Sequence, residues 1–314
     1  MAILITGGAG YIGSHTCVEL LNSGEDIIVT DNFFNSDPSV LDTVKRITGK
    51  EFKIYEADLL DMAAVDKIFD ENEIELVIHC AGYKCVTESI KKPLVYYSNN
   101  LRTTFNVLET MKKYGCTKFI FSSSATVYGI RHDSRITENF PMAAVNPYAS
   151  TKMVIENLIY EIHKASKAWT MISLRYYQPV GAHSSGLIGN RTLLKDLSGL
   201  AEIVGNDYPP YDESCVGDYI HVVDLARAHA LAVRKAREMD GGYRAYNIGL
   251  GRGVSDNDLA EIFRKISGKE IANADESADV FLDTSLVERD LGWKAELSLE
   301  DMCRDAWNFV QKNK

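Results

Sequence analysis

The sequence predicts an α/β fold in which a Rossmann-type, doubly wound parallel sheet is joined to a smaller C-terminal α/β domain. Short runs rich in β-branched and aromatic residues alternate with amphipathic stretches through the first half of the chain, as in parallel sheets covered by helices. The first run leads directly into a glycine-rich turn. With 314 residues, 46% of them hydrophobic, the chain is long enough to bury a core of this kind.

The expected strands and helices of the first half alternate along the chain. The β-rich runs predict strands over residues 2–6, 26–30, 53–56, 76–79, 118–122 and 171–175. Helical periodicity between them predicts helices over residues 11–22, 40–47, 62–72, 94–113 and 148–167. Right-handed crossovers would place these helices on both faces of one sheet, which makes the sheet doubly wound.

The second half has a less regular pattern. Residues 184–216 begin as a loop, contain one short helical stretch near 192–203, and include the turn Pro209-Pro210 in acidic surroundings. Beyond them we expect a strand, a long helix, a strand, a helix capped by Ser255 and a terminal helix capped by Ser298. These elements correspond to residues 218–222, 223–239, 246–248, 256–266 and a last helix that ends near Gln311.

The net charge excludes several classes of function. The chain has 44 acidic and 34 basic residues, a formal charge of −10, which is unfavourable for binding nucleic acid or an anionic membrane surface. No apolar run reaches the roughly 18 residues needed to cross a bilayer, and the N-terminus enters the first strand without a signal segment. We therefore expect a cytoplasmic protein with no nucleic-acid or membrane partner.

The six cysteines are scattered along the chain. They form no CxxC pair, and no Cys/His cluster has the spacing of a zinc site, so we expect no metal centre. Reduced thiols of this kind are typical of proteins in the cytosol.

The glycine-rich turn has the spacing of a dinucleotide-binding site. Gly7, Gly10 and Gly13 lie between the first expected strand and the first expected helix. In such a turn the first glycine permits the tight bend, the second lets the backbone approach a pyrophosphate, and the third lets helix and strand pack closely. The N-terminus of the following helix offers unpaired N–H groups and a positive dipole end to the phosphates.

An acidic residue follows the second expected strand at the position that dinucleotide-binding folds use. Asp31 lies 18 residues after Gly13, where a carboxylate can accept the hydroxyl groups of the adenosine ribose. Its charge would repel a 2′-phosphate and no arginine follows within residues 32–36, so the sequence predicts NAD rather than NADP. Asp58, after the third strand, could meet the adenine amino group or cap a helix over 59–72, and the sequence leaves both interpretations open.

A tyrosine and a lysine four residues apart are the candidate catalytic pair. Tyr148 and Lys152 open an expected helix, and their spacing places the phenol and the ammonium on one face. A cation near a phenol lowers its pKa from about 10 towards neutrality, so that phenolate can act as a general base. Such pairs also occur on helix surfaces without a function.

Three consecutive serines, Ser122 to Ser124, stand at the carboxyl end of the fifth expected strand. Doubly wound sheets bind their ligands at this edge, and a serine there can bridge a substrate hydroxyl and the tyrosine oxygen. The serines could instead satisfy only the backbone of the loop.

Longer motifs extend over nearly the whole chain. They are TGGAGYIGSH at 6–15, Asp31-Asn32, Ala81-Gly82, Lys84, Asn99-Asn100, FSSSATVYG at 121–129, PVGAH at 179–183 and DYIHV at 218–222. With these motifs the chain resembles the UDP-glucose 4-epimerase family of extended short-chain dehydrogenases/reductases. The resemblance implies an isomerase that holds NAD and acts on a sugar nucleotide, interconverting UDP-glucose and UDP-galactose or a related sugar.

The resemblance also implies roles for the catalytic residues. Tyr148 would remove the proton of the sugar 4-hydroxyl while C4 gives a hydride to the nicotinamide. Lys152 would lower the tyrosine pKa and hold the nicotinamide ribose, and Ser124 would position the hydroxyl. The 4-keto sugar would turn over and take the hydride back on its other face, which regenerates NAD. Related dehydratases carry an Asp-Glu pair where this chain has Ala125-Thr126, so dehydration is not expected.

The binding residues that the resemblance implies fall into two sets. Cofactor contacts are expected at Gly7, Gly10, Tyr11, Ile12, Gly13, Asp31, Asn32, Asn35, Ser36, Asp58, Leu59, Ala81, Gly82, Lys84, Asn99, Ser122, Tyr148, Lys152, Tyr176 and Pro179. Substrate contacts are expected at Lys84, Ser124, Ala125, Thr126, Tyr148 and Gln178.

The expected domains and oligomer follow from the same comparison. Residues 1–176 plus 218–248 would form the NAD-binding domain, and residues 177–217 plus 249–314 the smaller substrate-binding domain. The resemblance implies a homodimer formed through the helices over 94–113 and 148–167, although their apolar faces could equally belong to the core of one chain.

The second half departs from the family pattern where the nucleotide diphosphate is bound. Gly217 replaces an arginine, Gln178 replaces an asparagine, the stretch after Gly189 is shorter, and residues 274–279 are acidic. An arginine–phosphate contact contributes about 1.5 to 3 kcal/mol, so the loss of two would weaken a UDP-sugar by several orders of magnitude. The remaining candidate cations, each more typical of solvated surface, are Arg191, Lys195 and Arg252.

The sequence therefore leaves the sugar and the nucleotide open, together with two alternative functions. One is another extended short-chain dehydrogenase/reductase with exchangeable NAD, which would accumulate NADH. The other is a truncated homologue that holds NAD but has lost its sugar-nucleotide activity.

Overall fold

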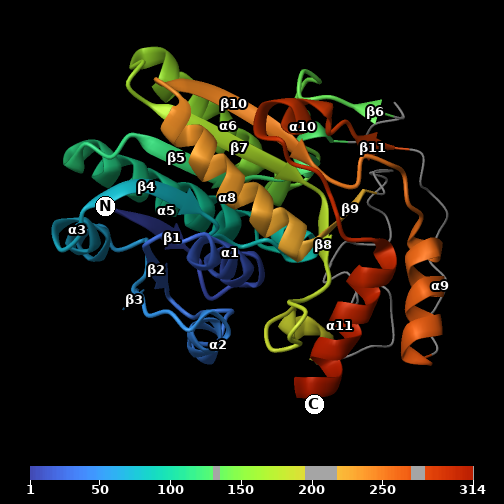
Figure 1. Ribbon diagram of the computed structural model, residues 1–314. Helices are drawn as coiled ribbons and strands as arrows, with labels where there is room; N and C mark the ends of the chain where they lie inside the picture. The colour runs from blue at the N-terminus through green and yellow to red at the C-terminus, as the bar shows by residue number, and fades with distance from the viewer. Residues whose placement is uncertain (130–134, 195–217, 270–279, 314) are drawn as a thin grey trace.

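The computed structural model describes residues 1–129, 135–194, 218–269 and 280–313, and its centre is a seven-stranded sheet (Figure 1). All neighbouring strands are parallel, in the order β10-β7-β5-β4-β1-β2-β3. The strands are β1 (Ala2–Thr6), β2 (Ile27–Asp31), β3 (Lys53–Glu56), β4 (Ile74–His79), β5 (Lys118–Ser122), β7 (Thr170–Tyr176) and β10 (Gly242–Ile248). Strands β2 and β3 follow one another outward on one side of β1, and β4, β5, β7 and β10 do so on the other side. The chain thus winds in both directions from β1, and the predicted doubly wound Rossmann-type fold is confirmed.

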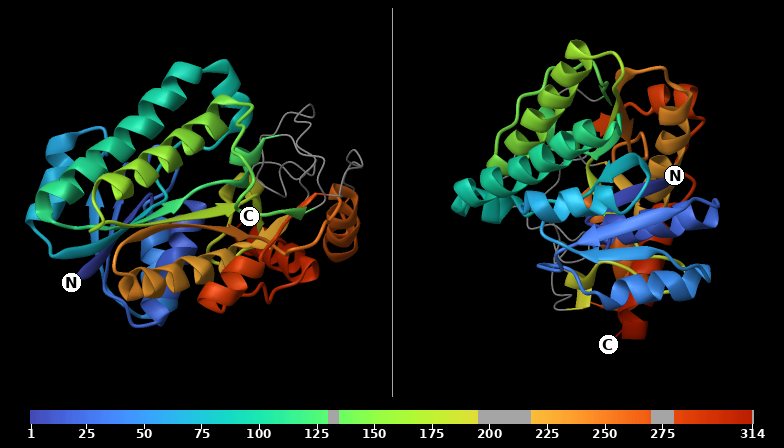
Figure 2. Two further views of the ribbon diagram at one scale, coloured as in Figure 1. Left: turned by 90° about the horizontal axis from the view of Figure 1, so that it is seen from above. Right: turned by 90° about the vertical axis from the view of Figure 1, so that its left-hand side faces the viewer.

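Helices cover both faces of the sheet, as Figure 2 shows. One face carries α1 (Tyr11–Asn22), α2 (Ser39–Thr48) and α8 (Val222–Glu238). The other carries α3 (Met62–Asp70), α5 (Pro93–Tyr114) and α6 (Pro147–Ala165). Side chains of β1 alternate between these layers, with Ile3 and Ile5 in one core and Leu4 in the other. All three are fully buried, which stabilises the fold by about 1.5 to 3 kcal/mol each.

The sequence located these elements to within a few residues, with differences at their ends. Strand β2 lies one residue later than expected, β4 starts at Ile74 and β10 starts at Gly242. Three short elements of the first half escaped the prediction: the helix α4 (Val86–Lys91), the 3-10 helix η1 (Ala125–Tyr128) and the strand β6 (Arg135–Ile136). They are too short to show a hydrophobic period.

The remaining strands form two small parallel pairs outside the central sheet. Strand β8 (Gln178–Val180) pairs with β9 (Tyr219–His221), and β6 pairs with β11 (Phe281–Leu282). The expected strand over 218–222 therefore does not join the large sheet, although it was assigned to that domain. Of the helical stretch expected near 192–203, the structure describes only the 3-10 turn η2 (Arg191–Leu194); the rest lies outside the described residues.

Two helices pack together beyond the carboxyl ends of the parallel strands (Figure 1). They are α9 (Asp256–Ser267) and α11 (Leu299–Asn313). The short helix α10 (Ser285–Leu291) lies between them in the chain. Their shared core includes Leu259, Phe263, Met302 and Val310. Ser255 and Ser298 cap them as predicted, since each hydroxyl accepts an N–H bond from an aspartate three residues later, at 3.0 and 3.2 Å.

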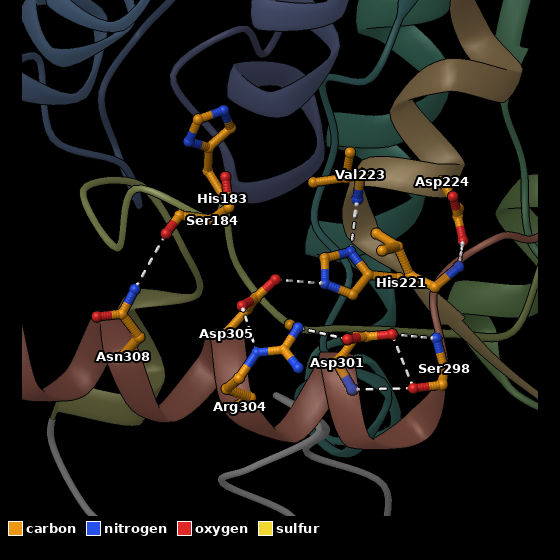
Figure 3. Close-up of polar contacts among 12 residues, drawn as sticks. His183, Ser184, His221, Val223, Asp224, Ser298, Asp301, Arg304, Asp305 and Asn308 are labelled. Carbon is orange, nitrogen blue, oxygen red and sulfur yellow. Dashed lines mark hydrogen bonds and ion pairs between the residues drawn. The ribbon is translucent and has the colours of Figure 1, made fainter.

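Polar contacts fasten α11 to the segment that follows β8 (Figure 3). The buried ring of His221, at the end of β9, accepts the Val223 N–H through Nδ1 and places Nε2 3.3 Å from the Asp305 carboxylate. Asn308 donates to the Ser184 carbonyl at 3.1 Å. These bonds hold the chain after Val180 against the C-terminal helix.

Among the described residues, no helix is both long and apolar enough to span a membrane.

Candidate active site

The glycine turn between β1 and α1 has the geometry that close approach to a ligand requires. Gly7 has φ +68°, a left-handed conformation that glycine adopts without strain. A Cβ at Gly13 would lie 2.2 Å from the Gly7 carbonyl oxygen, so only glycine fits where helix and strand meet. Gly10 is the N-cap of α1, and within the described residues no side chain caps it, nor is the first turn acidic. The N–H groups at this helix end therefore form an anion site.

A cleft opens over this turn along the carboxyl edge of the sheet. Its walls include many of the expected cofactor residues: Gly7, Gly10, Tyr11, Ile12, Gly13, Asp31, Asn32, Asn35, Ser36, Leu59, Ala81, Gly82, Lys84 and Asn99. Further lining residues that sequence reasoning missed are Phe34, Tyr83, Thr103, Asn190 and, as a cleft residue, Arg191. Loop aromatics and threonines carry no spacing signal, which is why the sequence did not single them out.

The carboxylate of Asp31 lies at one end of the cleft and is held in place by three donors. It accepts the Ala9 N–H at 3.0 Å, the Phe33 N–H at 2.9 Å and the Ser36 hydroxyl at 2.9 Å. A fixed carboxylate at the end of β2 is the arrangement that binds a ribose diol and disfavours a 2′-phosphate.

Asp58 does not cap the helix that follows it. Asp61 is the N-cap of α3 and accepts the Ala63 N–H at 2.9 Å, so the interpretation of Asp58 as a helix cap is wrong. Asp58 instead accepts the Leu60 N–H at 2.9 Å within the preceding turn and lies 3.4 Å from the Asn32 amide. Three residues, 59–61, separate Asp58 from the first residue of α3, which begins at Met62 as the helical pattern predicted.

The candidate catalytic residues converge at the other end, where β5 and α6 meet. The Tyr148 hydroxyl is hydrogen-bonded to Ser124, whose Oγ also accepts the Thr126 hydroxyl at 2.9 Å. Lys152 donates to the Ser122 carbonyl at 2.7 Å, and its Nζ lies 5.9 Å from the centre of the Tyr148 ring. The spacing on α6 thus brings phenol and ammonium to one place. Both side chains are over nine-tenths buried, and neither is among the residues that line the cleft.

The protonation states differ from the expectation. Burial raises the pKa of Tyr148 to about 12, and the hydrogen bond from Ser124 only partly opposes it. Burial likewise lowers the pKa of Lys152 to about 8, against the opposing influence of Cys80 and Glu156. The expected lowering of the tyrosine pKa by the lysine is therefore wrong for the polypeptide alone, because desolvation outweighs an ammonium that is directed at a carbonyl.

The three serines have separate partners rather than a common role in the loop. The Ser122 hydroxyl lies 2.5 Å from that of Tyr176, and the Ser123 hydroxyl donates to Glu156 at 2.5 Å. Ser124 alone reaches the phenol of Tyr148. Only the third serine is therefore placed to exchange a proton with the candidate base.

A buried ion pair anchors the helix that carries Tyr148 and Lys152. Arg175 of β7 binds Glu156 of α6 at 2.6 Å, and Tyr243 donates to the same carboxylate at 2.8 Å. Glu156 lies one helical turn after Lys152, and its third partner is Ser123. Because every partner of this buried carboxylate comes from a different element, the network fixes α6 against β5 and β7.

The remaining expected contacts lie beside the catalytic group. Tyr176 is buried at the end of β7, and Pro179 lies in β8. Cys80 lines the cleft and is hydrogen-bonded to Ser122, so it joins the cleft to the catalytic end. Among the described residues, Oε1 of Gln178 is a buried atom without a hydrogen-bond partner.

The divergent nucleotide-binding positions are only partly visible. Gly217, Lys195 and residues 274–279 lie outside the described residues. Arg191 is exposed, as expected of a surface residue, and it also pairs with Asp37 at 3.0 Å and lines the cleft. Arg252 is exposed, as expected of a surface residue. No group of metal-ligating side chains occurs in the part of the chain that the structure describes.

The cleft fits a nicotinamide dinucleotide. The uncapped helix end could hold a pyrophosphate and the held carboxylate an adenosine ribose, and a buried Tyr/Lys pair lies beside the cleft, next to its lining residue Cys80. The chain matches the model of the NAD dependent epimerase/dehydratase family over residues 3–249. It belongs to that family.

Known relatives narrow the comparison within the family. The chain is 49% identical to a UDP-glucose 4-epimerase of Bacillus subtilis over 332 aligned residues, covering 100% of this chain and 98% of the relative. It is 46% identical to a UDP-glucose 4-epimerase of Haemophilus influenzae, with the same coverage. Both aligned lengths exceed 314 residues, so parts of these relatives have no counterpart here.

Solved structures agree with the sequence relatives. A UDP-glucose 4-epimerase of Bifidobacterium longum in complex with NAD+ and UDP superposes with a TM-score of 0.87 at 40% identity, covering 100% of this chain and 99% of the other. A UDP-glucose-4-epimerase of Stenotrophomonas maltophila, with bound NAD and formylated UDP-arabinopyranose, has the same TM-score at 36% identity and covers 99% and 98%.

Proposed function

We propose that the protein is an NAD-dependent UDP-sugar 4-epimerase that interconverts UDP-glucose and UDP-galactose or a closely related pair. The observation that carries the proposal is the meeting of Ser124, Tyr148 and Lys152 beside a cleft suited to a dinucleotide, to which Cys80 connects them. UDP-glucose 4-epimerases at 49% and 46% identity support the choice of substrate class. Bound NAD in two structural neighbours supports the cofactor.

The cofactor would be held by residues along the whole cleft. The N-terminus of α1 at Gly10 would bind the pyrophosphate, Asp31 the adenosine ribose, and Lys152 the nicotinamide ribose. When bound, NAD would supply the acceptor of the hydride from the sugar.

Proton transfer belongs to the residues of the chain. Tyr148 accepts the proton of the substrate hydroxyl, directly or through Ser124, and returns it when the opposite epimer forms. The Thr126 hydroxyl donates to Ser124 Oγ, which leaves the Ser124 proton free to bond the phenol. The Nζ of Lys152 lies 5.9 Å from the centre of the Tyr148 ring. Burial of all these groups excludes water, which protects the oxidised sugar.

Gln178 is the residue we assign to the substrate on direct structural grounds. Its buried Oε1, without a partner among the described residues, can accept a hydroxyl or N–H donor. Burial of an acceptor without a partner costs free energy because its lost hydration is not replaced. A bound substrate that donates a hydrogen bond to it would offset this cost.

Calorimetry on the NAD-loaded protein tests the substrate class. We expect UDP, UDP-glucose and UDP-galactose to bind in the micromolar range. Matched titrations with glucose and galactose, which lack the nucleotide, should give no heat. No binding of any UDP compound would contradict the proposal and favour a protein that only holds NAD.

We also propose a homodimer formed through the surface of α5 and α6. These two helices lie side by side on one face of the sheet (Figure 2). Leu94, Val95 and Phe105 of α5 are 84%, 48% and 39% exposed, and Tyr160 of α6 is 45% exposed. Large apolar side chains exposed on neighbouring surface helices are typical of an interface between subunits.

Light scattering tests the oligomer. Phe105→Glu should convert a dimer into a monomer, because it places a charge in the apolar interface. Ile54→Glu is the matched control, since Ile54 is 36% exposed on β3, outside this surface. A wild-type monomer, or a Phe105→Glu dimer, would contradict the assignment.

We also propose boundaries for the two domains and a location in the cell. We place the NAD-binding domain at 1–176 plus 218–248 and the substrate-binding domain at 177–217 plus 249–314, with β9 at their junction because it pairs with β8. A cytoplasmic location accords with five described cysteines that form no disulfide.

A further inference from the structure

Two aromatic side chains meet across the mouth of the dinucleotide cleft. Phe34 comes from the loop after β2 and Tyr83 from the loop after β4, and both line the cleft. Their ring centroids are 5.4 Å apart with planes inclined at 42°. Strands β4 and β2 flank β1 in the sheet, so this pair spans the glycine turn that follows β1.

The loop after β2 is built to present Phe34 outward. Phe33 has φ +53°, and among the described residues it is the sole non-glycine residue with a positive φ. Its side chain packs against the core, and its N–H donates to Asp31. The next N–H, of Phe34, donates to the Asn32 side chain at 3.1 Å. The strained turn thus directs one phenylalanine inward and leaves Phe34 72% exposed, which is unusual for a large apolar side chain.

The opposite lip is rigid. The Tyr83 N–H donates to Asn100 Oδ1 at 2.8 Å, and the Tyr83 carbonyl accepts from the same amide at 3.0 Å. The Tyr83 ring also packs edge-on against Tyr96, at 5.6 Å, and Tyr96 is bonded to Glu88 at 3.0 Å. Tyr83 is therefore a fixed platform on which the exposed ring of Phe34 rests.

We propose that Phe34 and Tyr83 form an aromatic clamp that closes over the adenosine half of the bound dinucleotide and slows its release. Asp31, the glycine turn at the N-terminus of α1 and both rings line one cleft, so a dinucleotide held at Asp31 and at this helix end would pass between the two aromatic lips. The rings must separate before it can leave. This inference rests on the NAD binding of the proposed function, and it suits that function because an epimerase regenerates NAD in every cycle and has no need to exchange it.

Exchange of bound NAD tests the clamp. The NAD-loaded protein is mixed with excess radiolabelled NAD, and incorporation of label is followed by rapid gel filtration. Phe34→Ala and Tyr83→Ala should each speed exchange by about twofold to tenfold, since an aromatic pair contributes about 0.5 to 1.5 kcal/mol beyond the area it buries. The double variant should exchange no faster than either single variant, because the contact is already lost. Tyr83→Phe keeps the ring and should behave as wild type.

Tyr114→Ala is the matched control. Tyr114 forms a similar tilted pair with Phe69, at 5.8 Å and 35°, and neither residue lines the cleft. Its loss should leave the exchange rate unchanged. Normal NAD binding with unchanged exchange in Phe34→Ala would overturn the clamp alone, as would additive effects in the double variant. Failure of the wild-type protein to bind NAD would overturn the proposed function and the clamp together.

Discussion

Lys152 is a buried cation, and its replacement by methionine should stabilise the fold while it abolishes catalysis. Burial lowers the pKa of this lysine from 10.5 to about 8, and the side chain is only 8% exposed. The difference corresponds to about 3 kcal/mol by which folding disfavours the charged form. Loss of the bond to the Ser122 carbonyl offsets about 1 kcal/mol of this. Lys152→Met should therefore be about 2 kcal/mol more stable at pH 7.

The pH dependence gives the sharper form of this prediction. Below pH 8 both the folded and the unfolded lysine are charged, so the full cost is present. Between pH 8 and 10.5 the folded lysine loses its proton and the unfolded one keeps it, so wild-type stability should rise with pH. The methionine variant lacks this rise. Its advantage over wild type should shrink by about 3 kcal/mol between pH 7 and pH 10.5.

Urea denaturation of the NAD-free protein at a series of pH values measures the effect. Lys91→Met, which changes an exposed lysine of α4, is the matched control and should track wild type at every pH. A difference between wild type and Lys152→Met that stays constant from pH 7 to pH 10.5 would refute the reasoning, because the lysine would then have an ordinary pKa in the folded state.

Other variants test separate parts of the site. Tyr148→Phe should lose turnover by at least about a hundredfold, the usual share of a general base, and still bind NAD in calorimetry; full activity would refute its assignment. Ser124→Ala should lower kcat about tenfold to a hundredfold without weakening NAD binding, because Ser124 does not line the cleft; a loss of NAD affinity alone would contradict this. Gly13→Ala places a Cβ 2.2 Å from the Gly7 carbonyl oxygen, so it should destabilise the protein by about 1 to 3 kcal/mol in urea denaturation and weaken NAD binding; wild-type stability and NAD affinity in this variant would contradict the close approach.

The cofactor half could be predicted from sequence because its signals are local. The glycine turn and the following helix depend on residues within a few positions of one another, and Asp31 follows from the length of one βαβ unit. The Tyr148 and Lys152 side chains share a helix, so their proximity needs no knowledge of the fold. These features survive in the structure with small shifts of the element ends.

Other features depend on contacts between distant segments and left no such signal. The pKa of Tyr148 is set by burial beneath several elements, which the i, i+4 spacing cannot reveal. Asp58 and Asp61 both precede the helix α3, and only the point at which the turn between them ends decides that Asp61 is its cap. Strand β9 pairs with β8, and the paired residues Gln178 and Tyr219 are 41 positions apart in the sequence. The clamp of Phe34 and Tyr83 joins two separate loops. The place of Arg191 in the cleft depends on its approach to Asp37, far away in the sequence, which no local pattern reveals.

Conversion of UDP-galactose by the NAD-loaded protein tests the central claim most directly. Product formation is followed by NMR while absorbance at the NADH band is recorded in the same sample. We expect UDP-glucose to form over many turnovers without net accumulation of NADH, because the hydride returns to the same carbon. Accumulation of NADH in step with an oxidised sugar, or bound UDP-galactose that is never converted, would contradict the account.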